Sequence, residues 1–210
     1  MVKLKKILEA GYSKNPKKQA SELAKDGFIY DPNLSNEYHQ TYYNPTTGKM
    51  IFNVNGTNMY DPRDLLTDVY LAAGDLKSTT RYKEAEKAYH DAKNFYHPKN
   101  TILSGHSLGG SIASLLPTDK ATDKITVLDK GSTIGTETRG NETAYRTEGD
   151  PISALTANAK HSVTLENPNK ESFGLGVVKY IANTINPLFG TLIDMYNAHN
   201  VDNLDKNIDA

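Results

Sequence analysis

The chain has 210 residues, of which 37% are hydrophobic and 23% charged, and its formal net charge is −1. This length suits one domain with a substantial buried core. The near-neutral charge gives no reason to expect a nucleic acid as partner. Because the sequence contains no cysteine, disulfides, thiolate metal sites and a cysteine nucleophile are excluded. We therefore predict a single domain over residues 1–210.

The N-terminus is rich in lysine, but no apolar run of signal-peptide length follows it. No apolar stretch of about 18 residues, the length needed to cross a membrane, occurs anywhere in the sequence. The absence of cysteine together with many asparagine, lysine and tyrosine residues suits an AT-rich genome, viral genomes included. We therefore expect an intracellular protein or one associated with a virus particle.

Helices and strands alternate along most of the chain. Residues 1–37 are predicted to be an N-terminal helical segment, with helices over 2–10 and 15–26. The residues that follow predict a β-hairpin over 39–43 and 50–54, helices over 61–73 and 78–96, and strands over 101–104, 125–128 and 143–149, with a helix over 111–116. This order predicts an α/β fold, with a mostly parallel central sheet flanked by helices. The apolar segment 172–196 predicts two helices, either a lid or cap over a site or helices packed on the sheet.

The motif with the clearest chemistry is Gly105-His106-Ser107-Leu108-Gly109, which fits the pattern Gly-x-Ser-x-Gly between a predicted strand and a predicted helix. A serine on so sharp a turn has a strained backbone, and Gly105 and Gly109 must approach each other closely. The helix N-terminus behind the serine stabilises negative charge. We therefore predict that Ser107 is a catalytic nucleophile and that the Leu108 N–H points to a forming oxyanion.

A serine hydroxyl needs a base, and that base is usually a histidine oriented by a carboxylate. Two histidines follow Ser107, and we expect His199 to be the base, with His161 as the alternative. Asp150 is the expected acid, because it follows a predicted strand and precedes a proline that turns the chain. The acidic residues between Ser107 and these histidines include Asp119, Asp123, Asp129, Glu137, Glu142, Glu148 and Asp150.

Three segments in the right order resemble the class 3, or fungal-type, lipase family. They are Phe52 to Thr57 with the acidic stretch after it, Gly105 to Gly110, and Gly149 to Ile152, followed by a histidine at position 199. The resemblance implies an α/β-hydrolase fold and the triad Ser107, Asp150 and His199. It also implies that Thr57 is the second oxyanion-hole donor beside Leu108. Asn55 stands where the family often has arginine.

These observations together predict a serine hydrolase that cleaves carboxylic esters, in particular lipid esters, through an acyl-enzyme and with no cofactor or metal. A transient contact with a membrane surface is compatible with the basic first 25 residues. Two other functions remain open. One is a short-chain esterase or thioesterase, and the other is a catalytically silent module with a structural or membrane-contact role. The oligomeric state is not predicted.

Overall fold

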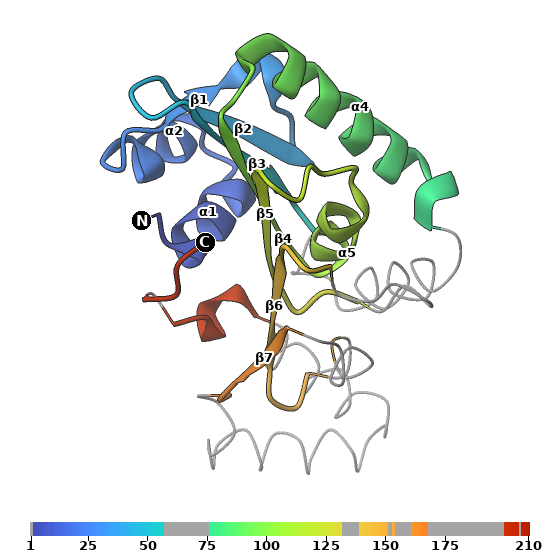
Figure 1. Cartoon of the computed structure of the whole chain (residues 1–210). Coiled ribbons are helices and arrows are strands. Elements are labelled where there is room, and N and C mark those ends of the chain that lie inside the picture. Colours follow the sequence, from blue (N-terminus) through green and yellow to red (C-terminus); the bar gives the residue numbers. More distant parts are fainter. Residues whose placement is uncertain are drawn as a thin grey trace.

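A seven-stranded sheet runs through the described part of the protein, with its strands side by side in chain order from β1 to β7 (Figure 1). The computed structural model describes residues 2–56, 76–131, 139–150, 153, 161–167, 200–205 and 207–210. The strands are β1 (Ile29–Asp31), β2 (His39–Asn44), β3 (Lys49–Val54), β4 (Asn100–His106), β5 (Asp123–Leu128), β6 (Glu142–Thr147) and β7 (Ser162–Leu165). Strands β1 to β3 pair antiparallel, and β3 to β7 pair parallel.

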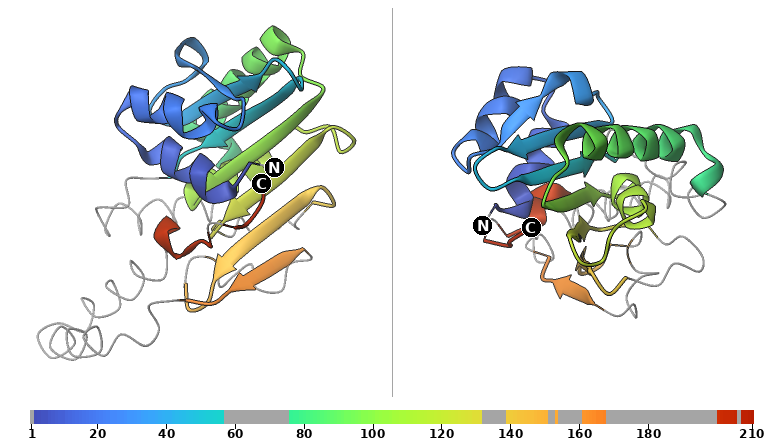
Figure 2. Two further views of the ribbon diagram at one scale, coloured as in Figure 1. Left: turned by 90° about the vertical axis from the view of Figure 1, so that its left-hand side faces the viewer. Right: turned by 45° about the horizontal axis from the view of Figure 1, so that its top comes forward.

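The order of the parallel strands decides which face each helix covers. Each parallel strand lies beside the previous one in the same direction, so right-handed connections place the intervening helices on one face. Helices α4 (Thr80–Tyr96) and α5 (Leu108–Leu115) lie on that face (Figure 2). Helices α1 (Leu4–Tyr12) and α2 (Pro16–Ala24) cover the opposite face. The sheet is therefore covered by helices on both sides.

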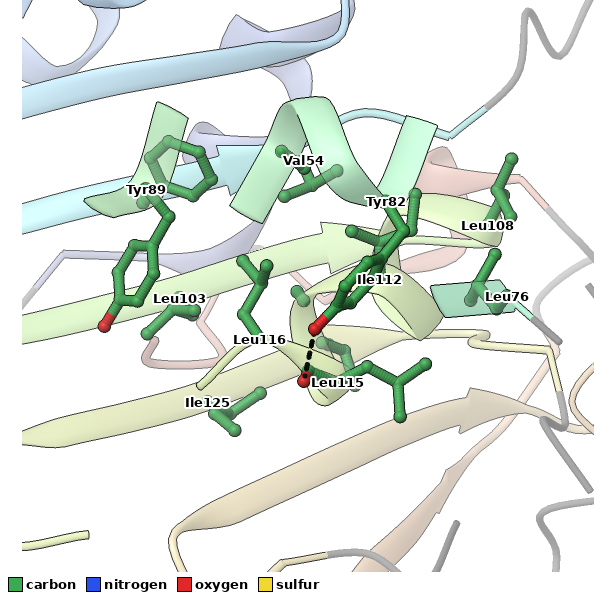
Figure 3. Close-up of a cluster of buried hydrophobic side chains, with 14 of the residues drawn as sticks. Val54, Leu76, Tyr82, Tyr89, Leu103, Leu108, Ile112, Leu115, Leu116 and Ile125 are labelled. Carbon is green, nitrogen blue, oxygen red and sulfur yellow. Dashed lines mark hydrogen bonds between the residues drawn. The ribbon is translucent and has the colours of Figure 1, made fainter. Parts of the chain in front are cut away.

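The larger hydrophobic cluster lies between the sheet and helices α4 and α5 (Figure 3). Helix α4 begins at a Thr79 cap, whose hydroxyl accepts the Tyr82 N–H at 3.2 Å. Its apolar residues recur every three or four positions, so one side of the helix faces the sheet. The Tyr82 hydroxyl donates to the Leu115 carbonyl at 3.2 Å and thereby links α4 to α5.

The second cluster lies beneath α1 and includes the end of the chain. Leu4, Ile7 and Leu8 are buried on the sheet side of α1. The Leu4 N–H donates to the Ile208 carbonyl, and the Ala210 N–H donates to the Val2 carbonyl, each at 3.0 Å. The first and last described residues are thus held together, close to α1 (Figures 1 and 2).

The predicted α/β fold with a mostly parallel sheet is confirmed, and so are the hairpin and the strand–helix–strand order around position 107. Two expectations need correction. The segment 1–37 is not helical throughout, because residues 29–31 form β1. The helix predicted over 111–116 begins earlier, at Leu108. The helices predicted over 61–73 and 172–196 lie outside the described residues.

Short 3-10 helices complete the described structure at Pro32–Leu34, Leu76–Ser78 and Val201–Asn203. Within the part of the chain that the structure describes, no helix has both the length and the apolar character needed to span a bilayer.

Candidate active site

Ser107 is the single residue between the end of β4 and the start of α5. Its backbone has φ 57° and ψ −130°, a conformation that non-glycine residues rarely adopt. The Ser107 N–H donates to the Leu128 carbonyl at the end of β5, at 3.1 Å. Its side chain is buried, and its hydroxyl forms no hydrogen bond with the described residues. The serine is therefore held in a strained turn by its backbone, while its hydroxyl remains available.

The two glycines of the motif are required by close backbone contacts. A β-carbon on Gly105 would lie 2.5 Å from the carbonyl carbon of Gly109. A β-carbon on Gly109 would collide with the carbonyl oxygen of Val54, on the neighbouring strand β3. The close approach expected of Gly105 and Gly109 is thus present in the structure. The turn cannot close in this way around larger residues.

The segment after β3 faces Ser107. A β-carbon on Gly56 would lie 3.1 Å from the Cβ of Ser107 and 2.7 Å from the carbonyl oxygen of His106. On the other side, Leu108 is the first residue of α5, so its N–H has no acceptor within the helix. Thr57, the other expected oxyanion donor, follows Gly56 directly but lies outside the described residues.

Tyr12, at the end of α1, connects the segment after β3 with the serine turn. Its hydroxyl oxygen accepts the Gly56 N–H at 3.2 Å and lies 2.9 Å from Nδ1 of His106. Burial raises the pKa of Tyr12 above its usual value, so the phenol stays protonated. His106 itself is fully buried.

Asn55 fixes the same segment through a buried network of amides. Its side-chain nitrogen donates to the carbonyls of Gly11 and Glu37, at 2.9 Å each, and its side-chain oxygen accepts from Asn53 at 2.9 Å. The Asn55 carbonyl accepts from the guanidinium of Arg81, on α4, at 2.8 Å. At the position where the resembled family often has arginine, this chain therefore has the amide of Asn55. The guanidinium of Arg81 binds the backbone carbonyl of that residue.

Asp150 lies in a turn at the carboxyl end of β6. Its N–H donates to the Thr147 carbonyl at 3.1 Å, and Gly149 has φ 81°, so glycine suits the third position of this turn. The carboxylate is buried, with 1% exposure, and its Oδ2 accepts the Ser153 N–H at 2.8 Å. Ser107 and Asp150 therefore both follow the carboxyl ends of parallel strands, at the same edge of the sheet.

Of the two candidate bases, His161 belongs to the described residues and His199 does not. His161 directly precedes β7, and its carbonyl accepts the Ala144 N–H near the start of β6 at 3.1 Å. Because β6 and β7 are parallel, His161 lies toward the amino ends of the strands, away from Ser107 and Asp150. No group of three or more histidine and acidic residues within the described ranges is arranged to hold a metal ion.

Comparison with known proteins agrees with this architecture. No protein-family model and no curated protein sequence matches the chain. Among solved structures, the Lip2 lipase of Yarrowia lipolytica is similar, at 12% identity with a TM-score of 0.52, over 79% of this chain and 77% of that one. The Rhizomucor miehei lipase in its propeptide complex is similar at 11% identity with a TM-score of 0.50. There the match covers 73% of this chain but 61% of the fungal one.

At these identities the likeness concerns the fold, and it confirms the α/β-hydrolase fold expected from the motif. The resemblance to fungal class 3 lipases seen in the sequence is thus matched by a resemblance in three dimensions.

Proposed function

We propose that this protein is a serine hydrolase that cleaves carboxylic esters, with Ser107 as nucleophile, His199 as base and Asp150 as the acid that orients the base. One observation carries the proposal: Ser107 is held at φ 57° between a buried strand and a helix N-terminus, without a hydrogen bond to its hydroxyl from the described residues. Such strain persists where the surrounding structure enforces it, which is typical of functional sites. A merely structural serine would have no need of this backbone conformation.

The reaction follows the usual route of a serine triad. The Ser107 hydroxyl attacks the ester carbonyl carbon while His199 takes its proton, and the carbonyl oxygen becomes an oxyanion. Collapse of this intermediate expels the alcohol, which receives the proton from His199, and leaves the acyl group on Ser107. Water, deprotonated by His199, then attacks the acyl carbon. The bond to the Ser107 oxygen breaks, His199 returns the proton to that oxygen, and the carboxylic acid leaves. No step requires a metal or cofactor.

The oxyanion hole in this mechanism is formed by the backbone N–H groups of Leu108 and Thr57. Support comes from the position of Gly56 against Ser107, because the next residue in the chain is Thr57. Each donor of this kind contributes on the order of 10²–10³ in kcat.

The choice of His199 as base depends mainly on the order of the residues in the chain. His161 lies near the amino ends of β6 and β7, whereas Ser107 and Asp150 follow carboxyl ends. The two ends of a strand the length of β6, which has 6 residues, are roughly 17–20 Å apart. This placement favours His199, which also has the expected position after the acid in the chain.

The proposed substrate is a lipid ester. The lipase-like motifs and the fold shared with two fungal proteins named as lipases support this choice. A series of p-nitrophenyl esters from acetate to palmitate tests it. Rates that rise with acyl length and with an emulsion surface support a lipase. Rates confined to short chains indicate a soluble esterase, and a preference for acyl-thioesters indicates a thioesterase.

A fluorophosphonate probe tests the reaction class itself. The folded wild-type protein is expected to be labelled at Ser107, while Ser107→Ala is not labelled. Turnover of esters by Ser107→Ala is expected to fall by about 10⁶. Absence of labelling in the folded wild-type protein would leave a silent module as the better description.

A further inference from the structure

A second buried carboxylate, Asp129, lies between the nucleophile strand and the acid turn. It follows β5 directly and is fully buried, with φ 45°. The carbonyl of the preceding residue, Leu128, accepts the N–H of Ser107 at 3.1 Å. The N–H of Asp129 donates to the carbonyl of Tyr145, on β6, at 2.8 Å. Asp129 is therefore one residue away from the backbone contact that holds the nucleophile.

Three hydrogen bonds from residues that the structure describes reach the two carboxylate oxygens of Asp129. Oδ1 accepts the Thr147 N–H at 2.5 Å and the Ser153 hydroxyl at 3.2 Å. Oδ2 accepts the Thr147 hydroxyl at 2.8 Å. An ionised carboxylate accepts hydrogen bonds and donates none, so this set of donors matches Asp129 in its charged form.

Both donor residues belong to the segment that carries Asp150. Thr147 begins the turn, because its carbonyl accepts the Asp150 N–H at 3.1 Å. Ser153 follows the turn, and its N–H donates to the Asp150 carboxylate at 2.8 Å. Asp129 thus holds the acid turn on both sides of Asp150, and Ser153 contacts both carboxylates.

We propose that Asp129 is a positioning residue that fixes the Asp150 carboxylate relative to Ser107. The inference rests on the proposed function, since it assigns Asp129 a part in the same reaction. Asp150 must meet the base with good geometry, and a misplacement of about 1 Å can reduce a rate by about 10². Asp129 orients Asp150 through Thr147 and Ser153, without itself touching the substrate.

The first test is Asp129→Asn. Asparagine tolerates a positive φ as aspartate does, so the backbone can stay while one acceptor becomes a donor. We expect kcat to fall about 10- to 100-fold with KM unchanged. Asp150→Asn, in contrast, is expected to lose about 10⁴ in kcat.

The double variant separates positioning from a general structural role. If Asp129 acts through Asp150, then adding Asp129→Asn to Asp150→Asn should change kcat by less than about twofold. A full 10- to 100-fold loss in that background would overturn the proposal. So would a loss in Asp129→Asn as large as in Asp150→Asn, since Asp129 would then itself be the triad acid.

Two milder substitutions allow the positioning role to be tested even if Asp129→Asn does not fold. Thr147→Val removes the hydroxyl donated to Asp129, and a roughly three- to tenfold fall in kcat is expected. The matched control is Thr126→Val in β5, where the buried hydroxyl forms no hydrogen bond within the described part of the chain, and it should keep wild-type kcat. Equal kcat in Thr147→Val and the control would refute the positioning role while fluorophosphonate labelling of wild type upheld the hydrolase. An unlabelled wild type would overturn both.

Discussion

Gly56 lies against Ser107 so closely that a β-carbon on the glycine would stand 3.1 Å from the Cβ of the serine. The same β-carbon would lie 2.7 Å from the Tyr12 hydroxyl. Gly56→Ala must therefore push the segment after β3 away from the serine turn. We expect kcat to fall by about 10² or more, as for loss of an oxyanion donor. Steady-state kinetics on a short p-nitrophenyl ester measure this fall in kcat. An unchanged kcat would show that this segment does not contribute to the reaction.

Tyr12→Phe removes a hydroxyl that contacts both the Gly56 N–H and His106. Because two buried polar groups then lose a partner, we expect the free energy of unfolding to fall by about 1–3 kcal/mol. We also expect kcat to fall about tenfold, since both sides of the site lose a shared contact.

The matched control for Tyr12→Phe is Tyr96→Phe, which removes a hydroxyl bonded to Asp31 at 2.7 Å. Tyr96 ends α4 shortly before the start of β4, whereas Ser107 follows the other end of that strand. It should cost stability but leave kcat unchanged. Equal kinetic losses in the two variants would argue against a specific role for Tyr12.

His39 makes stability depend on pH. It is 7% exposed and stacks on Phe52, and burial together with the nearby Arg81 charge lowers its pKa to about 4. The unfolded chain has the usual pKa of about 6.5, so between these values it binds a proton that the folded state does not. The contribution of His39 to the free energy of unfolding is therefore fully present above about pH 6.5. As the pH falls toward 4, up to about 3 kcal/mol of that free energy is lost.

Urea unfolding at pH 7 and pH 4.5 tests this dependence. His39→Phe should lose less stability over that interval than wild type, because the phenyl ring keeps the stack without a titrating group. His90→Gln, at an exposed position of α4, should keep the wild-type difference. If His39→Phe also keeps it, the acid sensitivity has another source.

The buried pair Lys130–Glu142 is expected to matter for folding. The two side chains are 4% and 0% exposed, and the Ser114 hydroxyl also donates to Glu142 at 2.7 Å. Glu142→Gln leaves a buried ammonium without its counter-charge, which costs about 3–5 kcal/mol of unfolding free energy. Lys87→Gln breaks the exposed pair with Asp91 and should cost less than about 1 kcal/mol. Chemical denaturation measures the free energy of unfolding of both variants. If Glu142→Gln lowers it as little as Lys87→Gln does, the buried pair does not contribute to stability.

The parts of the fold that could be predicted from sequence are those encoded locally. The serine motif depends on glycines two residues away on either side, and α4 on an apolar repeat of three to four residues. Asp150 was likewise predicted from a short pattern after a strand, whereas Thr57 was expected only because the segment from Phe52 to Thr57 resembles a known family. The order of the strands then brings Ser107 and Asp150 to one edge, as parallel topology requires.

The contacts missed from sequence join distant segments. Tyr12 and His106 are 94 positions apart, and nothing in α1 marks the tyrosine as part of a site. Asn53 and Asn55 offered a usable signal, because Asn53 interrupts the apolar residues of β3 and Asn55 directly follows Val54, the last residue of that strand. Amides in such positions must find partners when they are buried. The strands β1 and β7 have three and four residues with partly exposed faces, so they lack the apolar alternation that predicts a strand.

The most direct test of the central claim is fluorophosphonate labelling of folded protein, with the modified residue identified by peptide mass spectrometry. We predict stoichiometric modification of Ser107 in wild type, none in Ser107→Ala, and much slower modification in His199→Ala than in His161→Ala. A folded wild-type protein that resists the probe, or that is labelled at another residue, would contradict the assignment of Ser107 as a catalytic nucleophile.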